Sequence, residues 1–258
     1  MGTLVLGLVG LVGWMCAAFV GGPLLLSRAH WPLRRPRVAI AAWLGLVGAG
    51  LLGLAAALGW AVIAAVRLTG ADVADSVTTS MLAWTGLTAA GALASLVYVR
   101  VEAMRRSDDE ADAVLLLLAA STLARRDAGG VTVVQVEAEA PVAVSMAGRG
   151  CIVVSSRLTR ELTSDELAAV VAHESAHLSQ RHGRVAQLAR LSSACGPDVA
   201  GARWFARCAP LLLELAADDA AARRVGRPAL TSALTKLGRL QADAGMLLRA
   251  ARLAAHAA

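Results

Sequence analysis

The segment TSDELAAVVAHESAHLSQRH, residues 163–182, decides the fold of the second half of the chain. It begins with Thr163 and has Glu166 three residues later, which is the pattern of a capping box at a helix N-terminus. The segment therefore predicts a helix, which we expect to continue past Gly183 toward Leu191. Two histidines lie within this predicted helix at a spacing that suits a metal site.

His173 and His177 are separated by one helical turn, so both imidazole rings project from the same face of the predicted helix. Two imidazole nitrogens on one face of a rigid helix can occupy two positions of a tetrahedral zinc site. Glu174 is next to the first histidine but rotated away from it, where it can act as a base without being a ligand. The pattern H-E-x-x-H thus predicts a zinc centre. The competing interpretation is a surface helix that carries two histidines by chance.

A third ligand is predicted downstream, in the sequence ELAAD at residues 214–218. Glu214 would complete a set of two histidines and one glutamate, which is typical of catalytic zinc and leaves one position open. Asp218 lies one turn further along the same helix face and can accept the outer N–H of a ligating histidine. Asp219 is the second choice, because it points about 100° away on an ideal helix. The alternative for Glu214 is a solvated helix acid.

These residues are expected to lie in an α+β domain that covers residues 107–258. Short β-branched stretches predict strands at 131–137, 141–146 and 151–158, with a hairpin loop at 147–150 between the last two. Three further helices are predicted, at 107–127, at 211–226 with Pro210 near its start, and from Pro228 to about residue 243.

The first hundred residues are expected to form a helical membrane region. The chain is 57% hydrophobic with a mean hydropathy of +0.60, and its apolar residues are concentrated here. We predict three membrane spans, at about residues 3–26, 38–66 and 81–99, within a transmembrane region of residues 1–106. Each is about as long as a helix needs to be to cross the bilayer. No Asp, Glu, Lys, Arg or His lies within these spans, which argues against a transporter.

The placement of arginine predicts the orientation of these spans. The loop between the first two spans contains four arginines and no acidic residue: Arg28, Arg34, Arg35 and Arg37. Three arginines follow the third span: Arg100, Arg105 and Arg106. Because basic residues favour the cytoplasmic side, the N-terminus is expected outside and the C-terminal domain inside. We therefore predict a multi-pass protein of the cell membrane, with the lipid bilayer as a partner and a cytoplasmic catalytic domain.

The basic net charge of +6 does not indicate a nucleic-acid partner. Aromatic residues are only 3% of the chain, too few for base-stacking surfaces. The cysteines, Cys16, Cys151, Cys195 and Cys208, show no paired spacing and are expected to be reduced thiols. A metal-binding pair of Cys195 and Cys208 is the alternative.

The run RGCIVVSSRLTRELTSDELAAVVAHESAHLSQRH, residues 149–182, followed by ELAAD, resembles the M48 and M56 families of integral-membrane zinc metallopeptidases. The resemblance is strongest over about residues 131–225 and is specific at His173, Glu174, His177, Glu214 and Asp218. Three spans before a cytoplasmic domain are closer to M56, which includes antibiotic sensors with a penicillin-binding domain. We expect no such sensor domain here.

The resemblance implies a gluzincin-like fold and a zinc-dependent endopeptidase with one Zn²⁺ per chain. It implies His173, His177 and Glu214 as metal ligands, and Glu174 and Asp218 as catalytic residues. The substrate would be a protein or peptide, such as a transcriptional repressor or a membrane protein, and it could pair with an edge strand at 141–146.

Two questions stay open at this point. The residue that stabilises the oxyanion is not assigned, and His182, Arg184 and Arg223 are its candidates. The alternative function is a non-catalytic membrane signalling or scaffold protein in which zinc stabilises the domain. A site with a closed ligand shell and no glutamate beside the metal would be typical of that alternative.

Overall fold

The computed structural model describes residues 31–68, 94–106, 122–128, 130–195 and 200–255, with shorter stretches between residues 6 and 26 and between residues 77 and 92. The chain divides into two compact units. The first unit comprises Met1–Met104 and Leu188–Ala209, and the second unit comprises Arg105–Gln187 and Pro210–Ala258. The domain boundary expected between residues 106 and 107 stays a prediction.

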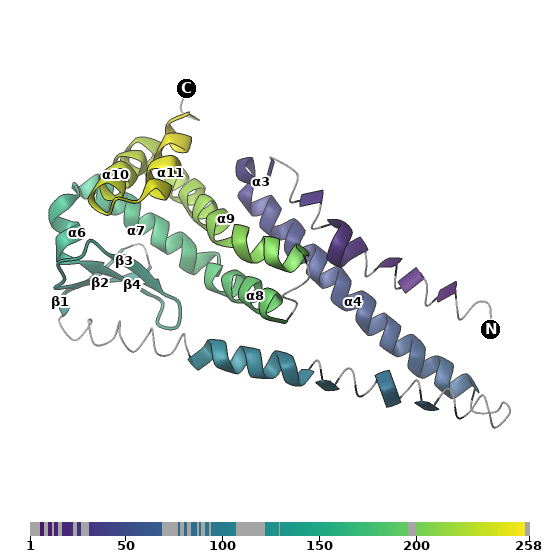
Figure 1. Ribbon diagram of the computed structural model, residues 1–258. Coiled ribbons are helices and arrows are strands. Elements are labelled where there is room, and N and C mark those ends of the chain that lie inside the picture. The colour runs from purple at the N-terminus through teal and green to yellow at the C-terminus, as the bar shows by residue number, and fades with distance from the viewer. Residues whose placement is uncertain are drawn as a thin grey trace. The chain divides into compact units, whose positions relative to one another are not determined.

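The second unit is built on a four-stranded sheet (Figure 1). Its strands are β1 (Thr122–Asp127), β2 (Thr132–Val136), β3 (Ala143–Met146) and β4 (Cys151–Ser155), in the order β1-β2-β4-β3. β2 and β4 are parallel, and the two outer pairs are antiparallel. The predicted strand at 141–146 is therefore an edge strand of the sheet, and its outer edge is not paired with another strand among the described residues.

β1 corrects the prediction of a helix at 107–127. Residues 122–127 are a strand that pairs with β2 from Thr122 opposite Val136 to Asp127 opposite Thr132. Ala128 donates a backbone hydrogen bond to Val131, which closes the turn between them. Pairing with a partner strand thus outweighs the helix propensity of Leu123, Ala124 and the two arginines that follow them. The rest of that predicted helix lies outside the described residues.

β3 and β4 form the predicted hairpin around residues 147–150. Gly150 has φ of 62°, a left-handed conformation that glycine adopts without steric cost. β4 ends at Ser155, earlier than the predicted strand end at residue 158. The Ser155 side chain accepts a hydrogen bond from the backbone N–H of Leu158, so it caps the short helix α6 (Ser156–Glu161).

α7 (Ser164–Ser179) begins at the predicted capping box. The Thr163 side chain accepts from the backbone N–H of Glu166, and the Glu166 side chain accepts from the backbone N–H of Thr163. The predicted continuation of this helix past Gly183 is wrong, because α7 ends at Ser179. Arg181 has φ of 53°, and a second helix, α8, starts at the next residue (His182–Cys195).

The chain ends in three helices, α9 (Ala200–Val225), α10 (Arg227–Leu240) and α11 (Ala244–Ala255). α9 starts earlier than the predicted helix at 211–226 and contains Pro210 in its interior. Gly226 separates α9 from α10 with φ of 91°, and Pro228 lies in the first turn of α10 as predicted. α11 was not predicted.

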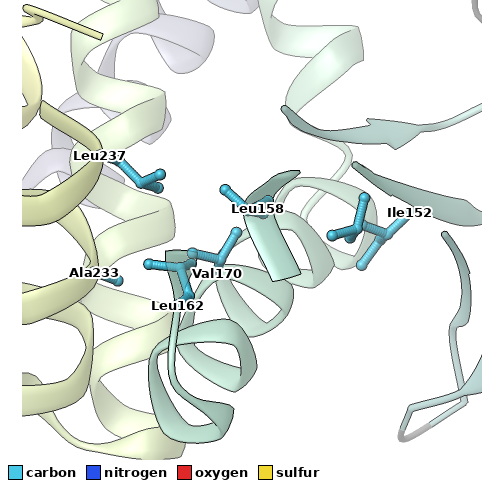
Figure 2. Close-up of a cluster of buried hydrophobic side chains, with 7 residues drawn as sticks. Ile152, Leu158, Leu162, Val170, Ala233 and Leu237 are labelled. Carbon is cyan, nitrogen blue, oxygen red and sulfur yellow. The ribbon is translucent and has the colours of Figure 1, made fainter. Parts of the chain in front are cut away.

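The core of the second unit lies where α7 packs between the sheet and α10 (Figure 2). Its buried residues come from β4, α6, α7 and α10 and from the turn before α7: Ile152, Val154, Leu158, Leu162, Val170, Ala233 and Leu237. No Phe, Trp or Tyr occurs in the sequence of this unit, so the core is aliphatic. A close-packed aliphatic core fixes α7, and with it the two histidines, relative to the helices that follow.

A buried carboxylate joins the start of α7 to α10. Glu166 accepts a hydrogen bond from the Ser232 hydroxyl at 2.6 Å and lies 2.7 Å from the ammonium of Lys236, in addition to its bond from Thr163. Burial alone would raise the pKa of Glu166, but Lys236, Ser232 and Thr163 outweigh it and lower the pKa to about 2. The ionised carboxylate therefore stabilises the contact between the two helices.

Replacing Glu166 with Gln is expected to destabilise the second unit by about 1–3 kcal/mol at pH 7, the usual contribution of hydrogen bonds to a charged group. Because the pKa of Glu166 is lower in the folded state, this stabilisation is complete above about pH 5 and is lost as the pH falls toward 2. The measurement is unfolding of the full chain in detergent, followed by far-UV circular dichroism from pH 7 to pH 2.

Glu161→Gln is the matched control, because it removes a half-exposed ion pair between Arg157 and Glu161 on α6. It should change the stability by less than about 1 kcal/mol. A Glu166→Gln variant that is as stable as wild type at pH 7, or that differs from it equally at pH 7 and pH 2, would refute this account of Glu166.

The first unit is organised around α4 (Pro36–Leu68), which follows the short helix α3 (Trp31–Arg34). The Trp43 ring on α4 stacks on Phe205 of α9 with ring centroids 3.5 Å apart. Near its middle, α4 accepts a hydrogen bond at Ala49 from the indole of Trp14. The C-terminal part of α8 and the N-terminal part of α9, within Leu188–Ala209, belong to the same unit as α4.

α4 corresponds to the predicted span at 38–66. It contains a stretch, Pro36–Trp60, that is long and apolar enough to cross a membrane by length and composition. It is the one such helix among the described residues. The predicted spans at 3–26 and 81–99 are described only in part, and they stay predictions.

Candidate metal centre

The two motif histidines lie side by side on the buried face of α7. The Nε2 atoms of His173 and His177 are 3.1 Å apart, and the side chains are 10% and 17% exposed. This proximity follows from their one-turn spacing on one helix. Both Nε2 atoms therefore point toward one position in space.

Glu214 on α9 points at the same position. Its Oε2 lies 3.3 Å from Nε2 of His173, and its Oε1 lies 3.4 Å from Nε2 of His177. These three residues are the group in the described part of the chain that could hold a metal ion. The structure thus brings together the three residues that the sequence predicts as ligands.

The spacing of the three donor groups fits a zinc ion. Ligands at about 2.0–2.1 Å from a tetrahedral zinc are about 3.3–3.4 Å from one another. The Nε2 atoms of His173 and His177 are 3.1 Å apart, and they lie 3.3 Å from Oε2 and 3.4 Å from Oε1 of Glu214, respectively, so the closest approach of each pair is near this value. Two imidazole nitrogens and one carboxylate are also the donor set of many catalytic zinc sites.

Each histidine has an outer partner at its other ring nitrogen. Nδ1 of His173 lies 3.0 Å from Oδ1 of Asp218, which is fully buried. Nδ1 of His177 lies 3.0 Å from Nδ1 of His182, at the start of α8. Such partners fix the ring orientation of a metal-binding histidine. Asp219 instead pairs with Arg252 on α11.

Arg249 is the residue of this centre that sequence reasoning missed. Its guanidinium contacts Asp218 through Nε and Nη2 at 2.8 and 2.7 Å, and it contacts Oε2 of Glu214 through Nη1 at 2.6 Å. It comes from α11, the helix that was not predicted. The amphipathic spacing of apolar residues at 246–253 is the sequence signal that could have revealed this helix.

The electrostatics of the centre favour a positive charge between its carboxylates. Burial opposes protonation of His173, but Asp218 and Glu214 outweigh it and raise the pKa of His173 to about 9. Burial and the charge on His173 lower the pKa of His177 to about 4. The pKa of Glu214 falls to about 2, because contacts with His173 and Arg249 outweigh burial. The ionised carboxylate of Glu214, next to two imidazole rings, therefore favours the binding of a cation at this position.

Glu174 lies beside this group and faces the edge strand. Burial raises the pKa of Glu174, although the charge of His173 and hydrogen bonds from the side chain and backbone of Ser145 on β3 oppose the rise. A carboxylate with a raised pKa is a stronger base than an ordinary glutamate, which suits proton transfer near neutral pH.

A chamber of about 400 Å³ opens beside His173, Glu174 and Glu214. Its lining includes residues 140–143, at the start of the edge strand, and Arg249. Most of the remaining wall is aliphatic: Leu158, Val170, Leu230, Leu234, Leu237 and Met246. An apolar chamber with a few polar groups in its lining is typical of a ligand-binding site.

The three candidates for the residue that stabilises the oxyanion lie in different environments. His182 is buried behind His177, so it lies on the outer side of the candidate ligand. Arg184 and Arg223 are exposed, and neither is among the described residues that line the chamber. Cys151, Cys195 and Cys208 are free thiols, as predicted, and Cys16 lies outside the described residues.

Comparison with protein-family models gives a match to peptidase family M48 over residues 119–207. The matched segment contains the sheet, His173, Glu174 and His177, and it ends before Glu214. Neither the curated proteins nor the solved structures that were searched contain a match to the chain. The match supports an M48-like metallopeptidase, whereas the resemblance to M56 has no such support.

Proposed function

We propose that this protein is a membrane-anchored, zinc-dependent endopeptidase that cleaves peptide bonds in a protein substrate. The observation that carries the proposal is the convergence of His173, His177 and Glu214, whose closest separations are near those of a tetrahedral zinc site, with Glu174 next to them. The M48 match over residues 119–207 supports the same class of enzyme. A site that only stabilised the fold would have no use for Glu174.

In this proposal His173, His177 and Glu214 hold one zinc ion, and Asp218 and His182 orient the two imidazoles from outside. Zinc, when bound, supplies Lewis-acid chemistry to the substrate carbonyl and to the attacking water. Glu174 accepts a proton from that water while the new carbon–oxygen bond forms. It then delivers the proton to the amine nitrogen as the carbon–nitrogen bond breaks, so the carboxylate is regenerated.

The substrate is proposed to bind in an extended conformation along β3. This strand pairs with β4 on one side, and its other edge has backbone groups that an added strand can use. Ser145 of this strand contacts Glu174, so a chain paired with β3 would pass close to the candidate base. The apolar chamber next to it would accept a large aliphatic or aromatic side chain of the substrate.

The membrane anchor is part of the proposal. α4 is long and apolar enough to span the bilayer, and the exposed Arg34 and Arg35 lie just before it. Because arginine favours the cytoplasmic side, the start of α4 and the second unit are proposed to face the cytoplasm. Two further spans, at 3–26 and 81–99, complete the proposed topology of the cell-membrane protein.

Removal of the metal tests this function. The full chain, purified in detergent, is expected to cleave an unfolded carboxymethylated protein, and 1,10-phenanthroline is expected to abolish the cleavage. Restoring stoichiometric Zn²⁺ after removal of the chelator should restore the rate, because the ligands are held by the fold. Cleavage that persists after the metal content has fallen below a few per cent would exclude a zinc peptidase. An inhibitor of serine peptidases is the control and should have no effect.

A further inference from the structure

The guanidinium of Arg249 lies between the two carboxylates of α9 that surround His173. It is only 11% exposed, and Asp218 beside it is fully buried. Its Nε and Nη2 each donate to a different oxygen of Asp218, and Nη1 contacts Oε2 of Glu214. One planar group therefore fixes two carboxylates at once, which the single ammonium of lysine cannot do with the same geometry.

The contacts form a chain from α11 to the candidate metal ligands. Arg249 holds both oxygens of Asp218, and Oδ1 of Asp218 in turn lies 3.0 Å from Nδ1 of His173. On the other side, Arg249 holds Oε2 of Glu214, while Oε1 of that carboxylate lies 3.4 Å from His177. The orientation of two of the three candidate ligands thus depends on one side chain.

The turn before α11 sets the position of Arg249. The carboxylate of Asp243 accepts hydrogen bonds from the backbone N–H groups of Gly245 and Met246 at 2.7 and 3.2 Å, which caps the helix. On the helix itself, Ala250 and Leu253 are buried against residues of α7, α9 and α10. α11 is therefore held in place both before and after Arg249. These contacts fix the position of the guanidinium along α9.

We propose that Arg249 is a positioning residue of the metal centre, which orients Asp218 and Glu214 so that His173 and Glu214 can bind zinc. The inference rests on the proposed metal site, and it makes α11 a part of that site. The charges agree with this role, because the single positive charge of Arg249 balances one of the two carboxylates, buried Asp218 and partly exposed Glu214, and leaves the charge of the other to a cation. Substrate does not need to touch Arg249 for it to act in this way.

The chain offers a matched control in a neighbouring ion pair. Arg252 on α11 contacts Asp219 on α9 at 2.9 and 3.2 Å, so it joins the same two helices with the same chemistry. Asp219 is not one of the three candidate ligands, and it is not the outer partner of either histidine. A change at Arg252 therefore measures the loss of the α9–α11 contact that it makes with Asp219.

The experiment compares Arg249→Gln, Arg249→Lys and Arg252→Gln in the full chain in detergent. Zinc affinity is measured by competition with a chelating dye, and the geometry is followed by the visible spectrum of the Co²⁺-substituted protein. Arg249→Gln is expected to raise the Kd for zinc about 10- to 100-fold, the usual effect of losing an outer partner, and to change the Co²⁺ spectrum. Arg249→Lys should restore affinity in part, and Arg252→Gln should match wild type within about twofold.

Two results would overturn the role of Arg249. The first is an unchanged Kd and Co²⁺ spectrum in Arg249→Gln. The second is an equal loss of affinity in Arg252→Gln, which would show that only helix packing matters. If Arg249→Gln does not fold, the test rests on Arg249→Lys. Wild-type zinc affinity and an unchanged Co²⁺ spectrum in Arg249→Lys would contradict the need for a planar guanidinium. Failure of the wild type to bind zinc would refute the proposed function itself, and with it this inference.

Discussion

Replacing Glu174 with Gln is expected to abolish cleavage of protein substrates while one zinc ion per chain is retained. The amide of glutamine has nearly the same size as the carboxylate but cannot take a proton from water. Glu174 is not one of the three groups that point at the metal position, so the ligand set remains intact. Loss of a general base lowers the rate by about 10²- to 10⁴-fold.

This result is measured as kcat/KM on an unfolded substrate, together with the zinc content of the same preparation. Glu161→Gln carries the same chemical change on α6, outside the chamber, and should cleave at the wild-type rate. Wild-type activity in Glu174→Gln would contradict the proposed mechanism. A wild type that binds zinc and cleaves no substrate would instead favour the non-catalytic signalling or scaffold function.

Replacing His173 with Ala is expected to reduce the zinc content from about one per chain to almost none. The substitution removes the ligand atom Nε2 and also leaves Asp218 without the imidazole that it orients. Two remaining donors on a site built for three hold zinc weakly. The helix itself should persist, because alanine is the best helix former and the capping box of α7 is unchanged.

The measurement is metal analysis after dialysis against a weak chelator, with far-UV circular dichroism to show that the variant is folded. His182→Gln is the milder control, because it changes the outer partner of His177 and leaves the three candidate ligands in place. It should weaken zinc binding by about 10- to 100-fold and not abolish it. A His173→Ala variant that keeps one zinc per chain would show that the ion binds elsewhere.

The sequence predicted the elements whose signals are local. The capping box of Thr163 and Glu166 marks the start of α7 within one residue, because both of its hydrogen bonds form between residues three apart. The one-turn spacings of His173 to His177 and of Glu214 to Asp218 survive in the structure, since each pair lies on one continuous helix. Glycine in the hairpin loop likewise predicts the turn between β3 and β4.

The elements that sequence reasoning missed depend on contacts between distant segments. Residues 122–127 form β1 because β2 is available as a partner. No local pattern in TLARRD predicts this pairing. α9 extends through Pro210 to Ala200, where Phe205 stacks on Trp43 from another part of the chain. Tertiary packing therefore outweighs the tendency of proline to end a helix.

The same reason explains why Arg249 was missed. Its role depends on α11 folding back onto α9, and an arginine in an amphipathic C-terminal segment has no distinctive spacing from the motif residues. The choice between Asp218 and Asp219, in contrast, was predicted from the helical period alone. The structure places Asp218 next to His173 and turns Asp219 toward Arg252.

The zinc K-edge X-ray absorption spectrum of the purified full chain tests the central claim most directly, because it reports the atoms bound to the metal. If His173, His177 and Glu214 are the ligands, the spectrum will show only nitrogen and oxygen neighbours at about 2.0–2.1 Å, with the outer scattering of two imidazole rings. A sulfur neighbour at about 2.3 Å would assign the metal to a cysteine such as Cys195 or Cys208. That result, or a folded protein that contains no zinc, would contradict the proposed centre.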